Sequence, residues 1–272
     1  MAEWAVEYEL HFVPSCLRVK SGSDLDEGRF SDCGVLKHTL HSPRHCPFPR
    51  VGCSTYMSET PDAPSIQSLR GKFIVLDGSE GCGKSTQARL LAERLRAAGL
   101  PVTEVRDPGS TKIGEKIRQI LLDPIHAEMG MRCEMMLYMA ARAQMMGEII
   151  LPALQAGNTV VCDRFVSSTL AYQLGGDGLT AEEIRATAEV AIKGWWPDLS
   201  IILDMPSIAA MARVRREKDR IEQRPAEYHE RVRQNYLAQA RYQPQRYRVI
   251  RADRGIDEVS AEIWEAVRSL AC

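Results

Sequence analysis

The residues best suited to chemistry in this sequence are three glycines, a lysine and two hydroxyls in the stretch VLDGSEGCGKST, residues 75–86. Gly78 to Ser85 has the spacing G-x-x-x-x-G-K-[ST], in which backbone N–H groups surround a phosphate and the lysine reaches the outer phosphates. Glycine suits such a loop because it adopts backbone angles that are closed to other residues. The run KFIVLD before the loop predicts a buried strand, and the apolar spacing after it predicts a helix that ends near Gly99. Strand, loop and helix in this order predict a P-loop that binds a nucleoside triphosphate.

A carboxylate and a guanidinium follow directly after a second predicted strand, TVVCD, which ends in Asp163 and is followed by Arg164. A carboxylate favours magnesium and a guanidinium favours phosphate. The alternative is an ordinary surface ion pair or a helix cap. Beside a P-loop, we favour the magnesium and phosphate interpretation.

The run RVRREKDRIEQR, residues 213–224, carries five arginines and a lysine among acidic residues. Such runs are usually solvated helix faces. The same run could instead form a mobile lid that brings arginines over a triphosphate, because phosphoryl transfer needs added positive charge in its transition state. The sequence leaves both interpretations open.

A long helix is predicted from about Arg132 to Leu154. Its Tyr138 and Arg142 are four residues apart and share one face, so they could hold a flat base by stacking and hydrogen bonding. A surface Tyr–Arg pair would have the same spacing. Five methionines are expected to fill the core as adaptable side chains: Met135, Met136, Met139, Met145 and Met146.

These residues need a scaffold that brings strand ends together, and the chain supplies one from Lys72 onward. Five short β-branched runs alternate with helical patterns, at residues 72–77, 101–106, 159–165, 199–205 and 247–252. Strands separated by helices pair in parallel through right-handed crossovers. We therefore predict an α/β fold, a three-layer sandwich with a five-stranded parallel sheet of the P-loop nucleoside triphosphate hydrolase type, with ligands at the carboxyl ends of the strands.

Composition limits the partners and the compartment. The net charge of −1 over 272 residues gives no global attraction to nucleic acid or to an anionic membrane. No stretch approaches the roughly 18 apolar residues of a membrane span, and the start lacks the plan of a signal peptide. Eight cysteines include no C-x-x-C pair, which favours free thiols in a reducing compartment. We expect a cytoplasmic protein.

Residues 1–69 show no sustained period and are expected to be a poorly ordered N-terminal extension, with residues 70–272 forming the domain. Translation beginning near Met57 is an alternative that would make much of the extension an artefact. A zinc site is a further alternative, although the spacings match no common zinc pattern; its ligands would come from Cys33, His38, His41, His45, Cys46 and Cys53.

Taken together, these pieces resemble the bacterial thymidylate kinases, a family of P-loop nucleoside monophosphate kinases, from Gly71 to Leu270. The matching stretches are DGSEGCGKST, RDPGST with IGEKIRQILL, YMAARAQ, PALQAGNTVVCDRFVSSTLAYQ, PDLSIILDMP and DRIEQ with YHERVRQNYLAQA. The resemblance implies transfer of the γ-phosphoryl group of magnesium ATP to dTMP, which yields dTDP for dTTP synthesis, by a homodimeric enzyme. The rivals are a kinase for another nucleoside monophosphate, a regulatory nucleotide switch and an inactive ATP-binding module.

The resemblance also assigns the residues that hold ATP. Lys84 would lie on the outer phosphates, and Ser85 with Asp163 would hold Mg²⁺. Because the P-loop carries Cys82 and no arginine, the catalytic arginines would come from a lid at about residues 213–226. The residues matched to the ATP-binding loop are Gly78, Ser79, Glu80, Gly81, Cys82, Gly83, Lys84, Ser85 and Thr86, and the matched lid arginines are Arg213, Arg215 and Arg220.

On the thymidylate side, Arg164 would clamp the acceptor phosphate and Glu80 would lie near the deoxyribose 3′-hydroxyl. Tyr138 would stack on thymine and Arg142 would donate to a thymine carbonyl. The remaining matched substrate residues are Arg106, Ser168 at the base edge, and Tyr172, which would disfavour a 2′-hydroxyl. Two positions depart from the family pattern: Asp107 stands where a glutamate is usual, and Asp177 where a basic residue is common.

Overall fold

Five short strands form one parallel sheet at the centre of residues 66–271, the part of the chain that the computed structural model describes. The strand order is β2-β3-β1-β4-β5, with every pair parallel. The strands are β1 (Phe73–Gly78), β2 (Val102–Arg106), β3 (Thr159–Asp163), β4 (Leu199–Asp204) and β5 (Tyr247–Arg251). All five predicted strands are thereby confirmed, with ends that differ by no more than two residues.

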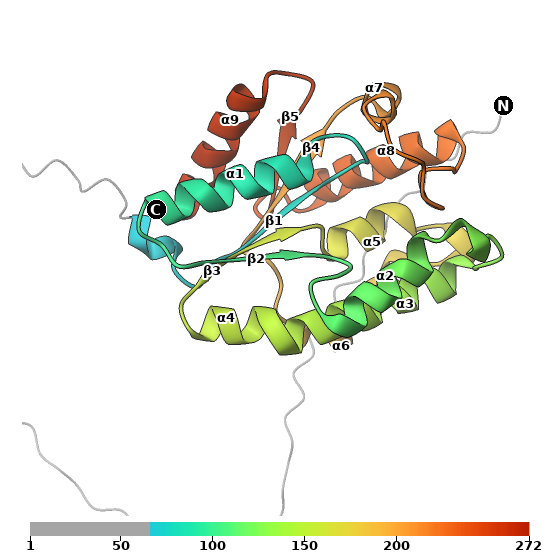
Figure 1. The fold of residues 1–272 in the computed structure, drawn as a ribbon, viewed down its shortest axis with the longest axis horizontal. Helices are drawn as coiled ribbons and strands as arrows, with labels where there is room; N and C mark the ends of the chain where they lie inside the picture. The colour runs from blue at the N-terminus through green and yellow to red at the C-terminus, as the bar shows by residue number, and fades with distance from the viewer. Residues whose placement is uncertain (1–65, 272) are drawn as a thin grey trace, which may run out of the picture. The chain divides into compact units, whose positions relative to one another are not determined.

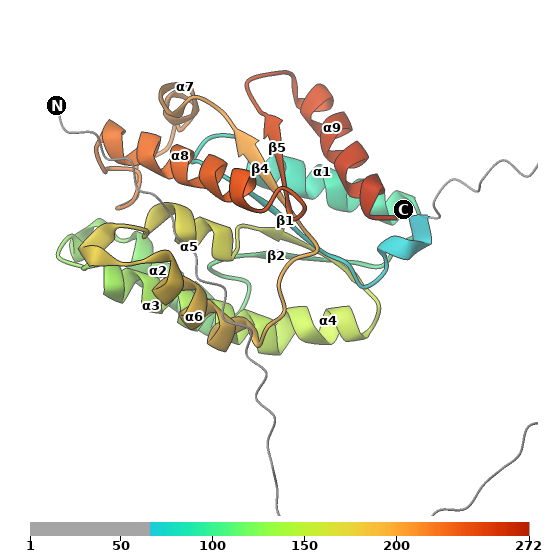
Figure 2. The same ribbon diagram turned by 180° about the vertical axis from the view of Figure 1, so that it is seen from behind.

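Helices cover both faces of this sheet (Figure 1). Helices α1 and α9 lie on one face, where Ala210 of α7 also packs, and helices α3 to α6 together with α8 cover the opposite face. Seen from behind, α5 and α8 lie side by side on that second face (Figure 2). The helices are η1 (Ile66–Leu69), α1 (Lys84–Ala97), α2 (Lys112–Leu122), η2 (Pro124–His126), α3 (Met131–Met145), η3 (Met146–Ile150, a π-helix), α4 (Leu151–Gln155), α5 (Val166–Tyr172), η4 (Gly176–Gly178), α6 (Ala181–Ile192), α7 (Ser207–Ala212), α8 (Ala226–Tyr242), α9 (Ile256–Arg268) and η5 (Ser269–Ala271).

The three central strands, β1, β3 and β4, are buried on both faces, which explains why their sequences are largely runs of apolar residues, whereas the edge strands β2 and β5 are partly exposed. Along β1, Ile74 and Leu76 pack against α1 and α9, whereas Phe73 and Val75 point into the core on the side of α3 and α6. Successive side chains of a strand alternate between faces, so one short strand serves two cores. The three-layer sandwich is confirmed.

The register brings the chemical residues to one edge of the sheet. Arg106, the last residue of β2, lies opposite Asp163, the last residue of β3, and Gly78 at the end of β1 lies opposite Leu203. The P-loop, the Asp163–Arg164 pair and the segment after β2 therefore leave the sheet side by side, as the parallel topology predicts.

The long helix predicted from Arg132 to Leu154 is present as α3, η3 and α4, which follow one another without a break. Four of its five methionines are buried, but Met136 is 55% exposed, so the prediction that all five pack in the core was wrong for this one. The error arises because Met136 lies on the outer face of the helix, one residue away from the buried Met135.

Residues 213–225 connect α7 to α8 without forming a helix. This contradicts the interpretation of the arginine-rich run as a solvated helix face. An irregular backbone here agrees with the other interpretation, a lid over the triphosphate.

Residues 66–69, which were expected to belong to the N-terminal extension, form η1. Leu69 is fully buried, its carbonyl accepts a hydrogen bond from Thr159 at 2.9 Å, and Ser68 donates to the Ala271 carbonyl at 3.2 Å, so η1 packs with the rest of the fold. The expectations for earlier residues, including the zinc alternative and a start near Met57, lie outside the described residues. Between Ile66 and Ala271, no helix combines the length and the apolar character that crossing a membrane requires.

Candidate active site

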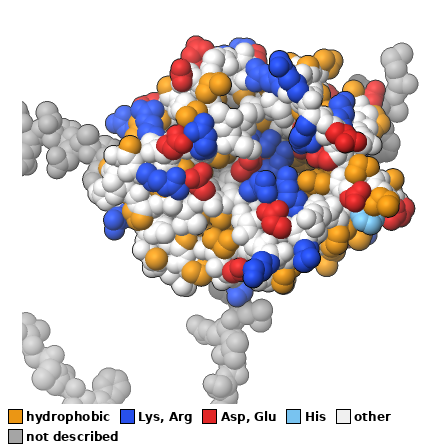
Figure 3. Space-filling view, in the orientation of Figure 1, with side chains coloured by type: hydrophobic (Ala, Val, Ile, Leu, Met, Phe, Trp, Pro, Cys, Tyr) orange, Lys and Arg blue, Asp and Glu red, His pale blue; other side chains and the backbone are white. Residues whose placement is uncertain are grey.

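A pocket opens at the carboxyl edge of the sheet. Figure 3 shows Lys and Arg side chains gathered in and around a hollow near the middle of this face. The P-loop, the ends of β2 and β3, and helices α2, α3 and α5 all contribute to it, together with the segment between α7 and α8. The lining residues are Glu80, Gly81, Lys84, Ser85, Arg106, Asp107, Pro108, Arg118, Leu122, Tyr138, Arg142, Asp163, Arg164, Ser168, Thr169, Tyr172, Gln173, Arg216, Asp219, Ile221 and Glu222.

The P-loop spans the turn from β1 to α1 and depends on its glycines. Gly81 has φ 74°, in the left-handed region, and a Cβ there would lie 2.0 Å from the Ala210 carbonyl oxygen of α7. Gly78 has φ 140°, and a Cβ would meet the Leu203 carbonyl at 2.5 Å. Larger residues at these positions would therefore displace the loop from α7 and β4.

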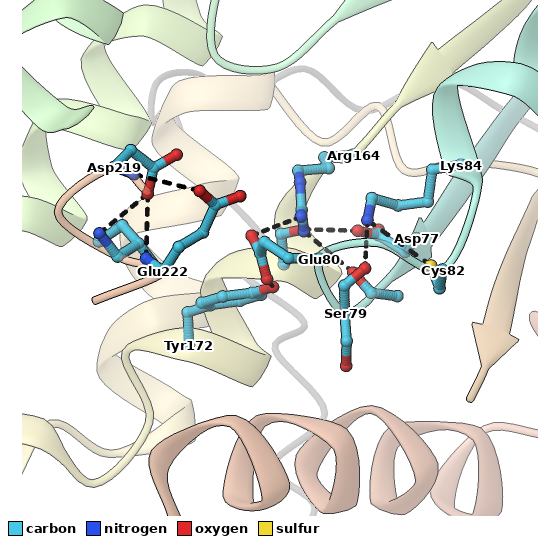
Figure 4. Close-up of polar contacts among 12 residues, drawn as sticks. Asp77, Ser79, Glu80, Cys82, Lys84, Arg164, Tyr172, Asp219 and Glu222 are labelled. Atoms are coloured by element: carbon cyan, nitrogen blue, oxygen red, sulfur yellow. Dashed lines mark hydrogen bonds and ion pairs between the residues drawn. The ribbon is translucent and has the colours of Figure 1, made fainter. Parts of the chain in front are cut away.

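Lys84 begins α1 and is buried beneath the loop. Its Nζ donates to the Ser79 carbonyl at 2.5 Å and lies 3.7 Å from Cys82 Sγ (Figure 4). None of the salt bridges among residues 66–271 involves Lys84. An ammonium without a carboxylate partner keeps its charge available for phosphate oxygens.

Ser85 and Asp163 form the part of the pocket suited to a magnesium ion. Ser85 Oγ donates to Asp163 Oδ2 at 2.5 Å, and Asp163 Oδ1 is buried without a hydrogen-bond partner among the described residues. A hydroxyl beside a carboxylate with one free oxygen is the oxygen donor set that Mg²⁺ prefers. These residues fit a Mg²⁺ that is also bound by phosphates.

Glu80 joins Arg164 and Tyr172 in a second cluster (Figure 4). Arg164 donates to Glu80 Oε1 at 2.7 Å and to the Gly78 carbonyl at 3.1 Å, and Tyr172 donates to Glu80 Oε2. Burial raises the pKa of Glu80, but the charges of Arg164 and Lys84 outweigh it and leave the pKa below its ordinary value. Glu80 is therefore an ionised acceptor at the mouth of the P-loop.

The backbone of Arg164 is strained, because φ is 73° at a residue that is not glycine. The Arg164 N–H donates to the Leu76 carbonyl at 3.0 Å, which holds the residue at the end of β1. Strain of this kind costs about 1–3 kcal/mol and is concentrated at functional sites. Here it aims the guanidinium at the P-loop.

Ser168 lines the pocket, but its hydroxyl is engaged by neighbouring side chains. Its hydroxyl donates to Asp77 Oδ1 at 2.5 Å and lies 2.7 Å from the Tyr236 hydroxyl, whereas Arg164 donates to it at 3.2 Å. The side chain is thus occupied by a buried network beneath the pocket. The neighbouring Thr169, which accepts from Arg142 at 3.2 Å, occupies the position beside the expected base site.

Arg142 and Asp107 form a buried ion pair at the other end of the pocket. Arg142 Nε donates to Asp107 Oδ2 at 2.6 Å and its Nη2 to the Phe165 carbonyl at 3.1 Å, and both side chains are 1% exposed. Burial raises the pKa of Asp107 despite the opposing charge of Arg142. Tyr138, one helical turn before Arg142 on α3, lines the same end of the pocket.

The two departures from the family pattern therefore have structural roles. Asp107 fixes the guanidinium of Arg142. Asp177 lies outside the pocket lining, and its Oδ2 accepts from the backbone N–H of Met131 at 2.5 Å and from that of Arg132 at 3.4 Å at the start of α3. A carboxylate at a helix N-terminus is stabilising, which accounts for an acid at position 177.

The three lid arginines predicted from the sequence are dispersed, and none lines the pocket. Arg213 donates to the Ala252 carbonyl at 3.5 Å, Arg215 is exposed, and Arg220 is buried against Glu134. The lid arginine in the lining is Arg216, whose two terminal nitrogens donate to Glu222 at 2.9 and 2.8 Å. A motif match gives the sequence position of an arginine, but the direction of its side chain depends on which acids lie nearby.

The structure brings most of the other predicted residues together. Those in the lining are Glu80, Gly81, Lys84, Ser85, Arg106, Tyr138, Arg142, Asp163, Arg164, Ser168 and Tyr172. The remaining loop residues, Gly78, Ser79, Cys82, Gly83 and Thr86, form the P-loop or the first turn of α1 without lining this pocket.

Ten lining residues are not among the site residues predicted from the sequence: Asp107, Pro108, Arg118, Leu122, Thr169, Gln173, Arg216, Asp219, Ile221 and Glu222. Helical spacing could have found two of them. Thr169 and Gln173 are four residues apart at the end of α5, as Ser168 and Tyr172 are, so they lie on one side of the helix. Arg118 on α2 donates to the Pro108 carbonyl at 3.1 Å, a contact that no local pattern indicates.

Comparison with known proteins points to one family. The family model described as thymidylate kinase matches residues 76–263. A thymidylate kinase from Pelotomaculum thermopropionicum is 44% identical over 205 residues, which cover 74% of this chain and 95% of that protein. One from Deinococcus radiodurans is 44% identical over 200 residues, which cover 73% of this chain and 97% of that protein.

A solved structure shares the fold. The crystal structure of thymidylate kinase from Ehrlichia chaffeensis matches with a TM-score of 0.60 and 29% identity. The match covers 73% of this chain and 99% of that one.

Proposed function

The chain belongs to the thymidylate kinase family and phosphorylates dTMP, and we propose that the pocket described above carries out the transfer from magnesium ATP. The observation that carries this proposal is that the unpaired Lys84 ammonium, Arg164 and the Tyr138–Arg142 face of α3 line one pocket. Donor phosphates, acceptor phosphate and base can therefore be bound at once. The rival interpretation as a kinase for another monophosphate is not favoured by the relatives.

The donor triphosphate lies in the P-loop, where backbone N–H groups and the start of α1 bind its anionic oxygens. Lys84 leaves the Ser79 carbonyl to contact the outer phosphates. Ser85 and Asp163 would hold Mg²⁺, which would neutralise charge on the phosphates. The burial of Lys84 and the free oxygen of Asp163 support these assignments.

The acceptor phosphate lies against Arg164, with Arg106 and Arg118 on its far side. Burial is the main cause that lowers the pKa of Arg118, and the nearby positive charges of Arg106 and Arg164 lower it further. A dianionic phosphate relieves that repulsion. Its attacking oxygen is ionised at neutral pH, so no side chain has to remove a proton from it.

The nucleoside is oriented by the remaining lining residues. Tyr138 stacks on the base, and Arg142 with Thr169 contacts its edge. Tyr172 and Glu80 lie at the sugar, where their mutual hydrogen bond leaves little room for a 2′-hydroxyl. Catalysis then consists of alignment and charge neutralisation, which is what phosphoryl transfer demands of a protein.

Among the lid residues, we keep Arg213 and Arg215 as the arginines that approach the transferred phosphoryl group. Arg215 is exposed, and among the described residues the one contact of the Arg213 guanidinium is a long hydrogen bond to the Ala252 carbonyl, so both side chains can move. The burial of Arg220 supports an anchoring role for it instead.

The test is a panel of monophosphates, dTMP, dUMP, UMP, dCMP, AMP and GMP, each with ATP and Mg²⁺. ADP release is followed by a coupled assay and the product is identified by mass spectrometry. We expect dTMP to be the best acceptor and dUMP the next, with UMP poor and purines near background. Mismatched donors at Arg142 should penalise dCMP by about 1–3 kcal/mol. A preference for AMP or dCMP would overturn the base-site assignment.

Three further proposals concern the oligomeric state, the location and the domain boundary of the protein. Exposed apolar side chains on α2 and α3, Ile113, Ile120 and Met136, support a homodimer through these helices, which sedimentation of an Ile120→Glu variant would test. The free thiols of Cys82, Cys133 and Cys162 support the cytoplasm as the location. The enzyme domain extends from Ile66, so a chain that begins at Ser65 should keep the turnover of the full chain.

A further inference from the structure

Glu134, near the start of α3 and outside the sequence motifs, is a fully buried carboxylate. It lies one helical turn before Tyr138 and two before Arg142, on the face of α3 that borders the pocket. Arg220 and Arg224 each donate to its Oε2, at 2.5 and 2.7 Å, and Gln173 donates to its Oε1 at 2.7 Å. Three segments far apart in sequence thus meet at one carboxylate.

The Glu134 carboxylate balances the charge of two guanidiniums, those of Arg220 and Arg224. Among the salt bridges of the described residues, Glu134 is the one acid that pairs with either Arg220 or Arg224. The other donors of these guanidiniums go to neutral acceptors, the Leu121 carbonyl at 2.9 Å and the Tyr228 hydroxyl at 2.5 Å. A neutral side chain at position 134 would leave two guanidiniums without a counter-charge, one of them buried.

Two residues of this cluster, Arg220 and Arg224, belong to the lid. Arg220 and Arg224 lie at either end of the stretch that contributes Ile221 and Glu222 to the pocket. Glu222 in turn holds Arg216, whose side chain is 62% exposed over the pocket. The position of the inner half of the lid, residues 219–224, therefore depends on the attachment to Glu134.

The third residue, Gln173, lines the base site. Gln173 is buried, lines the pocket and follows Thr169 by one helical turn. Because its Nε2 donates to Glu134, its Oε1 is turned away from that carboxylate, and no donor among the described residues reaches this oxygen. Without the carboxylate the amide could rotate and offer a donor in place of an acceptor.

We propose that Glu134 is a positioning residue that couples the lid to the base site, by holding the lid arginines Arg220 and Arg224 and the side chain of Gln173 with one carboxylate. The inference rests on the proposed function, because it assumes that the base lies beside Gln173 and that the lid closes on the donor. If this carboxylate is removed, we therefore expect the lid to lose its attachment and the base site to lose its selectivity at the same time.

The first experiment compares Glu134→Gln with Glu93→Gln, a matched control in which the acid of an exposed pair with Arg89 is neutralised. We expect Glu134→Gln to lower kcat at least about tenfold and to narrow the dTMP-to-dCMP ratio of kcat/KM by about tenfold, with the KM for ATP within about threefold. A merely structural role would lower the thermal midpoint but leave that ratio unchanged in the folded enzyme. A folded variant whose kcat and selectivity both stay within about twofold of the control overturns the proposal.

If Glu134→Gln does not fold, a double-mutant cycle takes its place. Arg224→Gln and Gln173→Leu each remove one partner of the carboxylate, and the guanidinium of Arg224 is not fully buried. Coupling through Glu134 predicts that the kcat/KM of the double variant departs from the product of the single effects by about fivefold or more. Additivity within about twofold, as expected for Arg224→Gln combined with Glu93→Gln, overturns the proposal.

The same assays separate this inference from the proposed function. The monophosphate panel is run first on the unmodified chain. If another monophosphate is preferred, the thymidylate assignment fails, and the coupling is then measured with that acceptor and its runner-up. If dTMP is preferred but the variants show neither effect, the coupling alone fails.

Discussion

The two ends of the pocket are built in different ways. The phosphate end is a single stretch of chain, Gly78 to Ser85, shaped by glycine backbone and by the turn from β1 into α1. The base and lid end is assembled by buried ion pairs between distant residues: Asp107 with Arg142, and Glu134 with Arg220 and Arg224. The first depends on local geometry and the second on long-range pairing. Substitutions at the two ends should therefore have different consequences for turnover and stability.

Lys84→Ala is expected to have the largest effect. Because the ammonium neutralises phosphate charge and has no carboxylate partner, its removal should lower kcat by about 10³-fold or more and leave the fold intact. A coupled ADP assay and circular dichroism measure the two quantities. Turnover at the level of the unmodified chain would refute the assignment of the P-loop.

Arg142→Ala should instead lower both activity and stability. Losing the guanidinium removes contacts to the base and leaves Asp107 buried without its partner, so we expect kcat/KM for dTMP to fall about 10- to 100-fold and the free energy of unfolding to fall by about 3–5 kcal/mol. Urea unfolding gives the second quantity.

The control is the double variant Arg142→Ala with Asp107→Asn, which removes the unpaired charge. It should recover part of the lost stability and none of the activity. If the double variant is less stable than Arg142→Ala alone, the buried ion pair does not account for the loss.

The lid itself offers a matched pair of arginines, one buried and one exposed. Arg220→Gln should lower the thermal midpoint by about 6–12 °C, the shift that corresponds to about 3 kcal/mol in a domain of this size. Arg215→Gln should leave the midpoint unchanged and lower kcat at least about tenfold, with a smaller change in the KM for dTMP. If both variants keep the midpoint, the lid is not divided into an anchored and a free part.

The smallest expected effect is a pH dependence at Asp77, which lies where the two ends meet. Burial raises the pKa of Asp77 above its ordinary value of 3.8, even though Ser167 and Ser168 donate to its carboxylate. The folded chain therefore binds this proton more tightly than the unfolded chain. The resulting stability is present below pH 3.8 and is lost as pH rises through the raised pKa.

Asp77→Asn has no such proton. The stability of the variant relative to the unmodified chain should therefore improve as pH rises above 3.8, with a slope of at most about 1.4 kcal/mol per pH unit. Urea unfolding from pH 4 to 7 measures the difference. A difference that stays constant or moves the other way would show that the Asp77 carboxyl does not titrate as its burial requires.

The fold and the phosphate end could be predicted from the sequence because their signals are local. Short β-branched runs gave all five strands, and the spacing of Gly78 to Ser85 gave the loop. The base end could be predicted only in part. Tyr138 and Arg142 share a helix face, but the burial of Arg142 against Asp107 depends on a residue 35 positions away.

The lid was the least predictable part. Its five arginines have the same chemistry, and only the folded chain distinguishes Arg220, buried against Glu134, from Arg216, held over the pocket by Glu222. The partners of the Ser168 hydroxyl could not be predicted for a similar reason, because Asp77 and Tyr236 both lie far from it in sequence. Long-range polar pairing leaves no periodic trace in the sequence.

The most direct test of the two-ended pocket is a crystal structure of the chain with dTMP and a non-hydrolysable ATP analogue. The account predicts the 5′-phosphate of dTMP within hydrogen-bond distance of Arg164, thymine stacked on Tyr138 with its edge at Arg142, and the analogue's phosphates in the P-loop beside Lys84. Thymidylate bound in the reverse direction, or a base placed away from α3, would contradict it.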